Sequence, residues 1–217
     1  MCFSATASFA SGAVLSVVGI AAIRKAKTPS RRVFASIPFI FAVQQLSEVF
    51  VWLSLTKQAL FHWQFLPAYI FLSVAYIVWP VWIPLSILLL EKKSKRKNIL
   101  YLLFGAGLVL AVYHTVYLVF YPVIAEIDGY HIRYKLSFPP ALFIFSSIFY
   151  AGSTVLPTFI SGIKRMWLLG VCITLAYIVT AIFYHAYIIS VWCYFAAFIS
   201  IIVYWIVVGL KNNSTNN

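Results

Sequence analysis

Seven long apolar runs divide this chain of 217 residues and limit the folds that it can adopt. Each run has close to the roughly 20 residues that a helix needs to cross the hydrocarbon core of a bilayer. We therefore expect an all-α fold, an integral membrane bundle of seven transmembrane helices. The predicted spans cover residues 3–23, 33–55, 66–90, 99–121, 136–160, 166–188 and 191–210.

The composition excludes an ordinary soluble domain. The chain is 64% hydrophobic and 9% charged, with a mean hydropathy of +0.98. Soluble chains are about 45–50% apolar and about 25% charged. A chain of this size also keeps too much surface in water for very large soluble cores. We expect one seven-helix transmembrane domain over residues 1–210, followed by a polar cytoplasmic tail over 211–217.

The positive charges predict how the chain is oriented in the membrane. The net charge is +12, and the Lys and Arg residues form short clusters between apolar runs. This pattern is typical of topology signals and lipid-headgroup contacts, so the lipid bilayer is the expected partner and nucleic acid is not. All but Lys57, Arg133 and Lys135 fall on one side of the predicted membrane. The positive-inside rule then places the N-terminus outside and the C-terminus in the cytoplasm, in the cell's inner (plasma) membrane.

Glu48 is the acidic residue that most needs a functional explanation. The chain has four acids, and only Glu48 falls within a predicted span; Glu91, Glu126 and Asp128 fall in polar connections. A carboxylate inside a membrane helix costs roughly 2.5–3.5 kcal/mol on insertion scales and marks a functional site by default. Three and four residues before Glu48 stand Gln45 and Gln44, which therefore share its helical face. That face is expected to point into the bundle.

Two histidines lie at a depth where they could join Glu48 in a metal site. His114 lies in the fourth span and His185 near the outer end of the sixth. One carboxylate and two imidazoles can hold zinc or another transition metal and leave a fourth position for water. The bound water would then be acidic enough to attack an ester or amide. On the same stripes as the histidines stand Tyr117 and Tyr184, which we expect to bind the substrate or ligand together with Gln44 and Gln45.

Structural roles are the competing explanation for each of these groups. Glu48 could be protonated or paired with a tyrosine hydroxyl, and each histidine could be a hydrogen-bonded residue of the bundle. A haem held by His114 and His185 is disfavoured by their unequal depths.

Cys2 is a candidate nucleophile at the outer end of the first span. Removal of Met1 would give Cys2 an α-amine with a pKa near 8 beside its thiol. Such a pair could act as a nucleophile with its own base, so Cys2 is predicted to be catalytic with Glu48. The competing explanation is that a cysteine near the start has no role.

The opening residues Met-Cys-Phe-Ser-Ala-Thr-Ala-Ser-Phe and the later Gln44-Gln45-x-x-Glu48-x-x-x-Trp52 pattern carry a resemblance. Together they resemble an uncharacterised bacterial family of multi-pass membrane proteins that opens with the same signature. The resemblance covers roughly the first two spans. It implies a small integral membrane protein and supplies no activity.

Two functions of different classes follow from these residues. The first is a membrane-embedded, metal-dependent hydrolase or lipid-modifying enzyme with a polar pocket in the outer half of the bilayer. The alternative is a non-catalytic sensor or carrier for a small apolar ligand, whose one polar group is held by Glu48, Gln44 and Gln45 among aromatic walls. The sequence leaves the substrate and the oligomeric state open.

Overall fold

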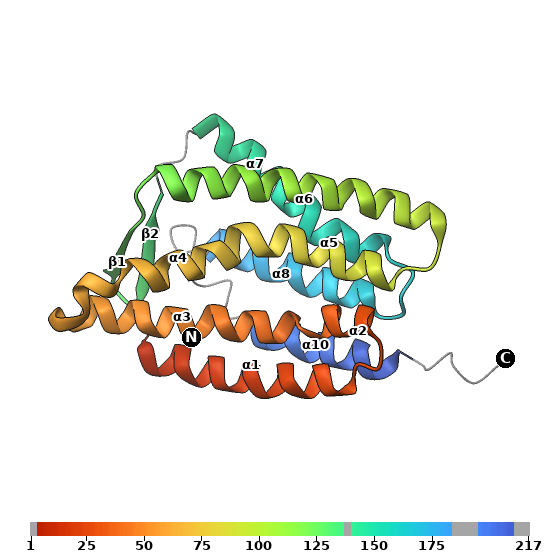
Figure 1. The fold of residues 1–217 in the computed structure, drawn as a ribbon, viewed down its shortest axis with the longest axis horizontal. Helices are drawn as coiled ribbons and strands as arrows, with labels where there is room; N and C mark the ends of the chain where they lie inside the picture. The colour runs from red at the N-terminus through yellow and green to blue at the C-terminus, as the bar shows by residue number, and fades with distance from the viewer. Residues whose placement is uncertain (1–3, 137–139, 184–194, 211–217) are drawn as a thin grey trace.

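The computed structural model describes residues 4–136, 140–183 and 195–210 and shows an elongated helical bundle (Figure 1). Helix α3 lies between α1 on one side and the α4–η2–α5 rod on the other, and α6 lies beyond that rod. The helical elements are α1 (Ala5–Lys25), α2 (Pro29–Ala35), α3 (Ile37–Thr56), η1 (Gln58–Trp63), α4 (Phe65–Ser73), η2 (Val74–Val78), α5 (Trp79–Leu90), α6 (Ser94–Phe120), α7 (Pro140–Ile160), α8 (Met166–Phe183) and α10 (Ala196–Gly209).

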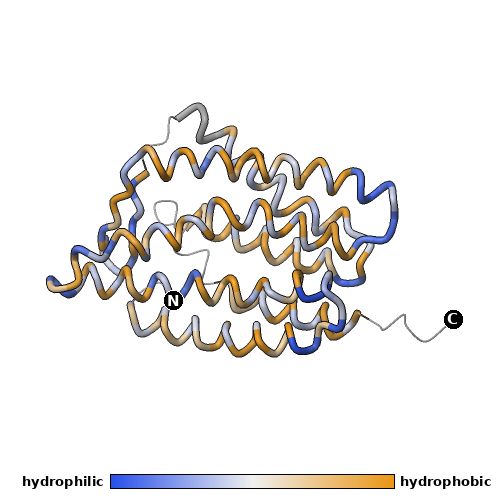
Figure 2. The backbone as a smooth tube through the Cα atoms, viewed as in Figure 1, coloured by the Kyte–Doolittle hydropathy of each residue, from blue (hydrophilic) through white to orange (hydrophobic). Residues whose placement is uncertain are grey.

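The expected all-α membrane architecture is confirmed in its coarse form. Within the described residues, five helical stretches are long and apolar enough to cross a membrane, and two shorter apolar helices accompany them. The hydropathy colouring shows an apolar middle with polar loops gathered at the two ends of the bundle (Figure 2). This band indicates a membrane protein. The five stretches are Ala5–Lys25, Pro29–Thr56, Phe65–Leu90, Ser94–Phe120 and Met166–Phe183.

The polar connection expected over residues 122–135 contains a β-hairpin. Strand β1 (Ile124–Asp128) pairs antiparallel with β2 (His131–Lys135), and Gly129 takes the left-handed conformation, φ +60°, in the turn between them. Ala125 and Ile132 pack against the ends of α3 and α4. The hairpin therefore covers one end of the bundle, which a solvated loop would leave open.

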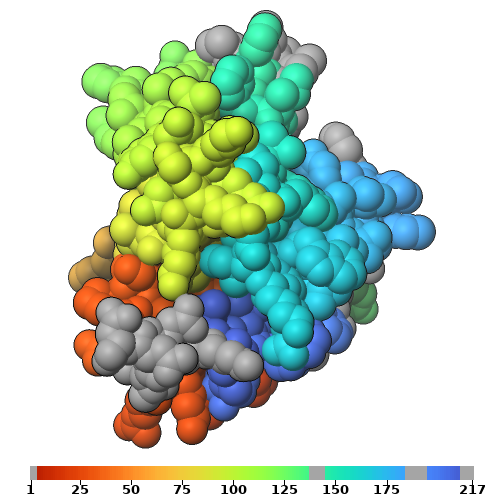
Figure 3. Space-filling view, turned by 90° about the vertical axis from the view of Figure 1, so that its right-hand side faces the viewer, coloured from red at the N-terminus to blue at the C-terminus, as the bar shows by residue number. Residues whose placement is uncertain are grey.

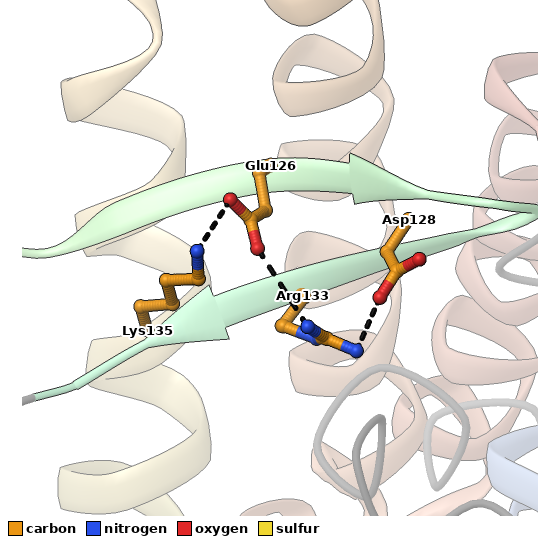
Figure 4. A network of polar contacts seen from close by, with 4 residues as sticks. All are labelled: Glu126, Asp128, Arg133 and Lys135. Atoms are coloured by element: carbon orange, nitrogen blue, oxygen red, sulfur yellow. Dashed lines mark ion pairs between the residues drawn. The ribbon is translucent and has the colours of Figure 1, made fainter.

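Charged side chains link the two strands of the hairpin across its surface (Figure 4). Arg133 pairs with both Asp128 and Glu126, and Lys135 pairs with Glu126 at 2.8 Å. The four charges cancel, so the hairpin carries no net charge in these pairs.

Two prolines shape the central rod where it meets its neighbours. In the π turn η2, the carbonyl of Ala75 would accept a hydrogen bond from the N–H five residues later, at position 80. Pro80 has no N–H, so this carbonyl lacks a donor within the helix. The Tyr150 hydroxyl of α7 donates to that carbonyl at 2.7 Å. Pro84 likewise frees the carbonyl of Pro80, and Gly107 of α6 lies so close that a Cβ there would clash with it. The prolines thus set where α6 and α7 pack on the rod.

Helices α1 and α3 pack closely because small residues face the contact. A Cβ on Gly19 would lie 2.7 Å from the backbone nitrogen of Phe39, and one on Gly12 would lie 2.8 Å from the Leu46 side chain. Helix α10 packs against both helices. We call this region, formed by α1, α3 and α10, the closed side of the bundle.

Candidate functional site

A partly open cavity of about 520 Å³ lies on the other side of α3. Its walls come from α3, η2, α5, α6, α7, α8 and α10, and they are mainly apolar and aromatic. None of its lining residues among those described is Asp, Glu, Lys or Arg. The lining residues used below are Phe41, Gln44, Tyr76, Trp79, His114, Ile148, Tyr150, Gly152, Leu156 and Tyr177.

Gln44 places an amide at the cavity wall. Its side chain is 2% exposed, and its Oε1 accepts a hydrogen bond from Trp79 Nε1 at 3.0 Å. An indole nitrogen can only donate, so this contact fixes which end of the amide faces Trp79. The Gln44 Nε2 then remains as a donor for whatever occupies the cavity.

His114 reaches the same cavity from α6. Its imidazole is buried and lies 4.8 Å from the Tyr76 ring, measured between ring centroids. The ring contacts Tyr76 of the central rod and forms part of the cavity wall. The structure thus brings His114 and Gln44 to one cavity.

Glu48 lies on the closed side, although it is only one helical turn from Gln44. Its side chain is 0% exposed and accepts a hydrogen bond from Ser8 Oγ of α1 at 3.4 Å. Gln45 is also buried, and its Nε2 finds no hydrogen-bond partner within the described part of the chain. Neither residue lines the cavity, so the three polar groups of α3 do not converge on one point.

The remaining predicted site residues do not extend this arrangement. Tyr117 is partly exposed on α6, stacks on Tyr121 at 4.8 Å, and does not line the cavity. Cys2, Tyr184 and His185 lie outside the described residues. Among the residues that are described, no three His, Cys, Asp or Glu side chains are placed to hold a metal ion. The metal set of Glu48, His114 and His185 therefore stays a prediction.

The sequence reasoning missed the residues that make the cavity. Trp79 is absent from the predicted site, yet it is buried against Phe41 with ring centroids 4.1 Å apart. Tyr150 and Gly152 of α7 were not singled out. The available signal was the Pro80 position, which frees a carbonyl inside a membrane and so requires a hydroxyl such as that of Tyr150 nearby.

Glu91 organises the loops at the basic end of the bundle. Its carboxylate accepts backbone hydrogen bonds from Gly162 at 2.7 Å, Lys92 at 3.0 Å and Lys93 at 3.2 Å. Burial raises the pKa of this carboxyl, but these N–H groups and the nearby Arg96 outweigh it and hold the pKa below its usual value. Seen from this end, the start of α6 and the α7–α8 turn lie side by side (Figure 3).

Fold and site together define a helical bundle with membrane-length apolar helices and a partly open, mainly apolar cavity. The chain belongs to the family of unknown function DUF6629, whose model matches residues 1–216. The match covers nearly the whole chain and agrees with the expectation of an uncharacterised family. No curated protein and no solved structure matches the sequence.

Proposed function

We propose that this protein is an integral membrane protein that binds a small, largely apolar ligand in the cavity between α3 and α8, as a sensor or carrier. The observation that carries the proposal is the cavity itself. Its volume of about 520 Å³ falls within the roughly 300–1,000 Å³ of sites for small molecules, and such sites are mainly apolar with few polar groups.

The lining favours a neutral ligand over a charged one. A charged group moved into an apolar site loses its hydration and needs a counter-charge there. The described lining offers the Gln44 amide, the His114 ring and several hydroxyls, and no carboxylate, ammonium or guanidinium. A neutral, lipid-soluble molecule meets this requirement.

The topology is part of the proposal. Seven spans with the N-terminus outside, in the plasma membrane, agree with the polar ends of the bundle and with the clustering of Lys and Arg at one of them. A fluorescent-protein fusion at residue 217 should fluoresce, and an alkaline phosphatase fusion there should be inactive. The reverse pair of results would overturn this orientation.

The binding proposal is tested by filling the cavity. Gly152 lines it, and a Cβ there meets nothing nearer than Leu156 at 4.0 Å, so Gly152→Phe places a ring in the cavity without a backbone clash. Gly105 of α6 has no atom within 4 Å of its Cβ position and does not line the cavity, so Gly105→Phe is the matched control. Native mass spectrometry should find bound lipid on the wild type and Gly105→Phe, and none on Gly152→Phe. Equal bound mass on all three would contradict the proposal.

The hydrolase hypothesis keeps a separate test. Elemental analysis of the purified wild type beside Glu48→Gln should show about one zinc per chain, lost in the variant, if Glu48 is a ligand with His114 and His185. No metal in either protein would leave Glu48 as a hydrogen-bonding group of the closed side.

A further inference from the structure

Resting on the proposed function, we infer the chemical class of the ligand. It is a neutral membrane lipid whose flat ring carries carbonyl oxygens, as in a para-quinone. One carbonyl accepts a hydrogen bond from Gln44 Nε2, and the ring lies among the aromatic side chains around Trp79.

The first step is the direction of the hydrogen bond. Two of the acceptors at the cavity already receive one: Gln44 Oε1 from Trp79, and the Ala75 carbonyl from Tyr150. The Gln44 amide nitrogen, by contrast, donates no hydrogen bond within the described part of the chain. Gln44 lines the cavity, so a ligand there that accepts a hydrogen bond from this nitrogen is favoured over one that cannot. A carbonyl does this, and a hydrocarbon cannot.

The second step is the shape of the polar end. Phe41, Tyr76, Trp79, Tyr150 and Tyr177 all line the cavity, and they come from α3, the central rod, α7 and α8. Aromatic side chains make offset-stacked and edge contacts, which favour a flat conjugated ring over a flexible chain. The described lining has no charged side chain, and this favours an uncharged polar end of the ligand over a carboxylate or phosphate.

The third step is the route by which a ligand enters the cavity. Three lining residues are also strongly exposed: Ile148 at 64%, Leu156 at 48% and Tyr177 at 42%. They belong to α7 and α8, so the cavity reaches the apolar side of the bundle between these helices. This side faces the lipid tails if the bundle spans a membrane, and a ligand that enters there is dissolved in the bilayer.

A matched pair of probes tests the carbonyl requirement. Menadione and 2-methylnaphthalene share a fused, methylated ring system and differ in two carbonyl oxygens. Calorimetric titration in detergent should show that the wild type binds menadione about tenfold more tightly, as one buried hydrogen bond provides. Gln44→Leu should bind both compounds equally. This variant leaves the Trp79 N–H without its acceptor. The double variant Gln44→Leu/Trp79→Phe removes both partners of that hydrogen bond and should also show no preference for menadione.

Each failure has a distinct meaning. Equal affinity of the wild type for the two probes, or a preference that survives both Gln44 variants, overturns the carbonyl class while cavity binding stands. Binding of either probe that is unchanged in Gly152→Phe places the probe elsewhere and overturns the inference. No binding of either probe by the wild type, together with no bound lipid in the mass spectrometry above, overturns the proposed function as well.

Discussion

Glycines play opposite roles in the helices on the two sides of α3. On the closed side, Gly19 lets the backbones of α1 and α3 approach so far that its Cβ would lie 2.7 Å from Phe39. On the hollow side, formed by the cavity and its walls, Gly152 faces open space, with Leu156 the nearest atom at 4.0 Å. A glycine in a membrane helix therefore marks a close contact or a void, and only the facing helix decides which.

The largest expected effect comes from filling the closed side. Gly19→Val should lower the free energy of unfolding by about 3 kcal/mol, because the added side chain meets backbone that cannot move aside. Gly105→Val adds the same side chain to α6 where nothing lies within 4 Å, and it should change stability little. Denaturation in detergent micelles measures both. Similar stabilities for the two variants would show that α1 and α3 are not closely packed.

The next effect concerns the loops at the basic end of the bundle, which Glu91 joins. Glu91→Gln should cost about 2 kcal/mol at neutral pH, because backbone N–H groups of Gly162, Lys92 and Lys93 lose a charged acceptor.

The lowered pKa of Glu91 gives this effect a pH dependence. A carboxyl whose folded pKa is below its unfolded value stabilises fully above the unfolded pKa, about 4.3. That stabilisation is lost as the pH falls through the folded pKa. Melting temperatures of the wild type and Glu91→Gln should therefore converge on acidification below pH 4. A gap that stays constant with pH would contradict this role.

A smaller effect separates the two polar groups of α3. Glu48→Gln should change stability by about 1 kcal/mol through its contact with Ser8 and should leave menadione affinity within twofold of the wild type. Gln44→Leu should abolish the menadione preference instead. Calorimetry on both variants measures this. A large loss of affinity in Glu48→Gln would mean that the two sides of α3 form one site.

The smallest effect is expected at the hairpin surface. Arg133→Ala should cost less than about 1 kcal/mol, because its partners Glu126 and Asp128 are more than a third exposed and solvent screens the pairs. Raising the salt concentration should remove the difference from the wild type. A cost that persists in high salt would show that the guanidinium packs rather than pairs.

The helices were predictable because apolar length and basic clusters both mark their ends. The third span, predicted over 66–90, occupies Phe65–Leu90. The fourth begins earlier than predicted, at Ser94, because its first turn includes Lys95, Arg96 and Lys97. The hairpin was missed, although Asp128-Gly129 between alternating residues is a hairpin signal.

The site was predictable only in part. That Gln44 and Glu48 are buried follows from polar groups in an apolar span. That they face different neighbours does not, since the sequence contains no information on which helix packs beside which. The walls of the cavity come from seven helical elements, and no local sequence pattern predicts a space that their side chains leave unfilled.

The π turn at Val74–Val78 also has a consequence for how this rod tolerates insertions and deletions. Each residue turns an α-helix by about 100°, so a wide turn shifts the angular phase of everything beyond it. In α4, before the turn, Phe71 and Leu72 point towards the hairpin. In α5, after the turn, Trp79 points towards the cavity. If this segment took α geometry with the same number of residues, one half of the rod would rotate against the other, whereas deleting one residue as well would bring the halves back near their present phase. The number of residues in this segment therefore matters as much as their identity for the relative orientation of the two halves of the rod.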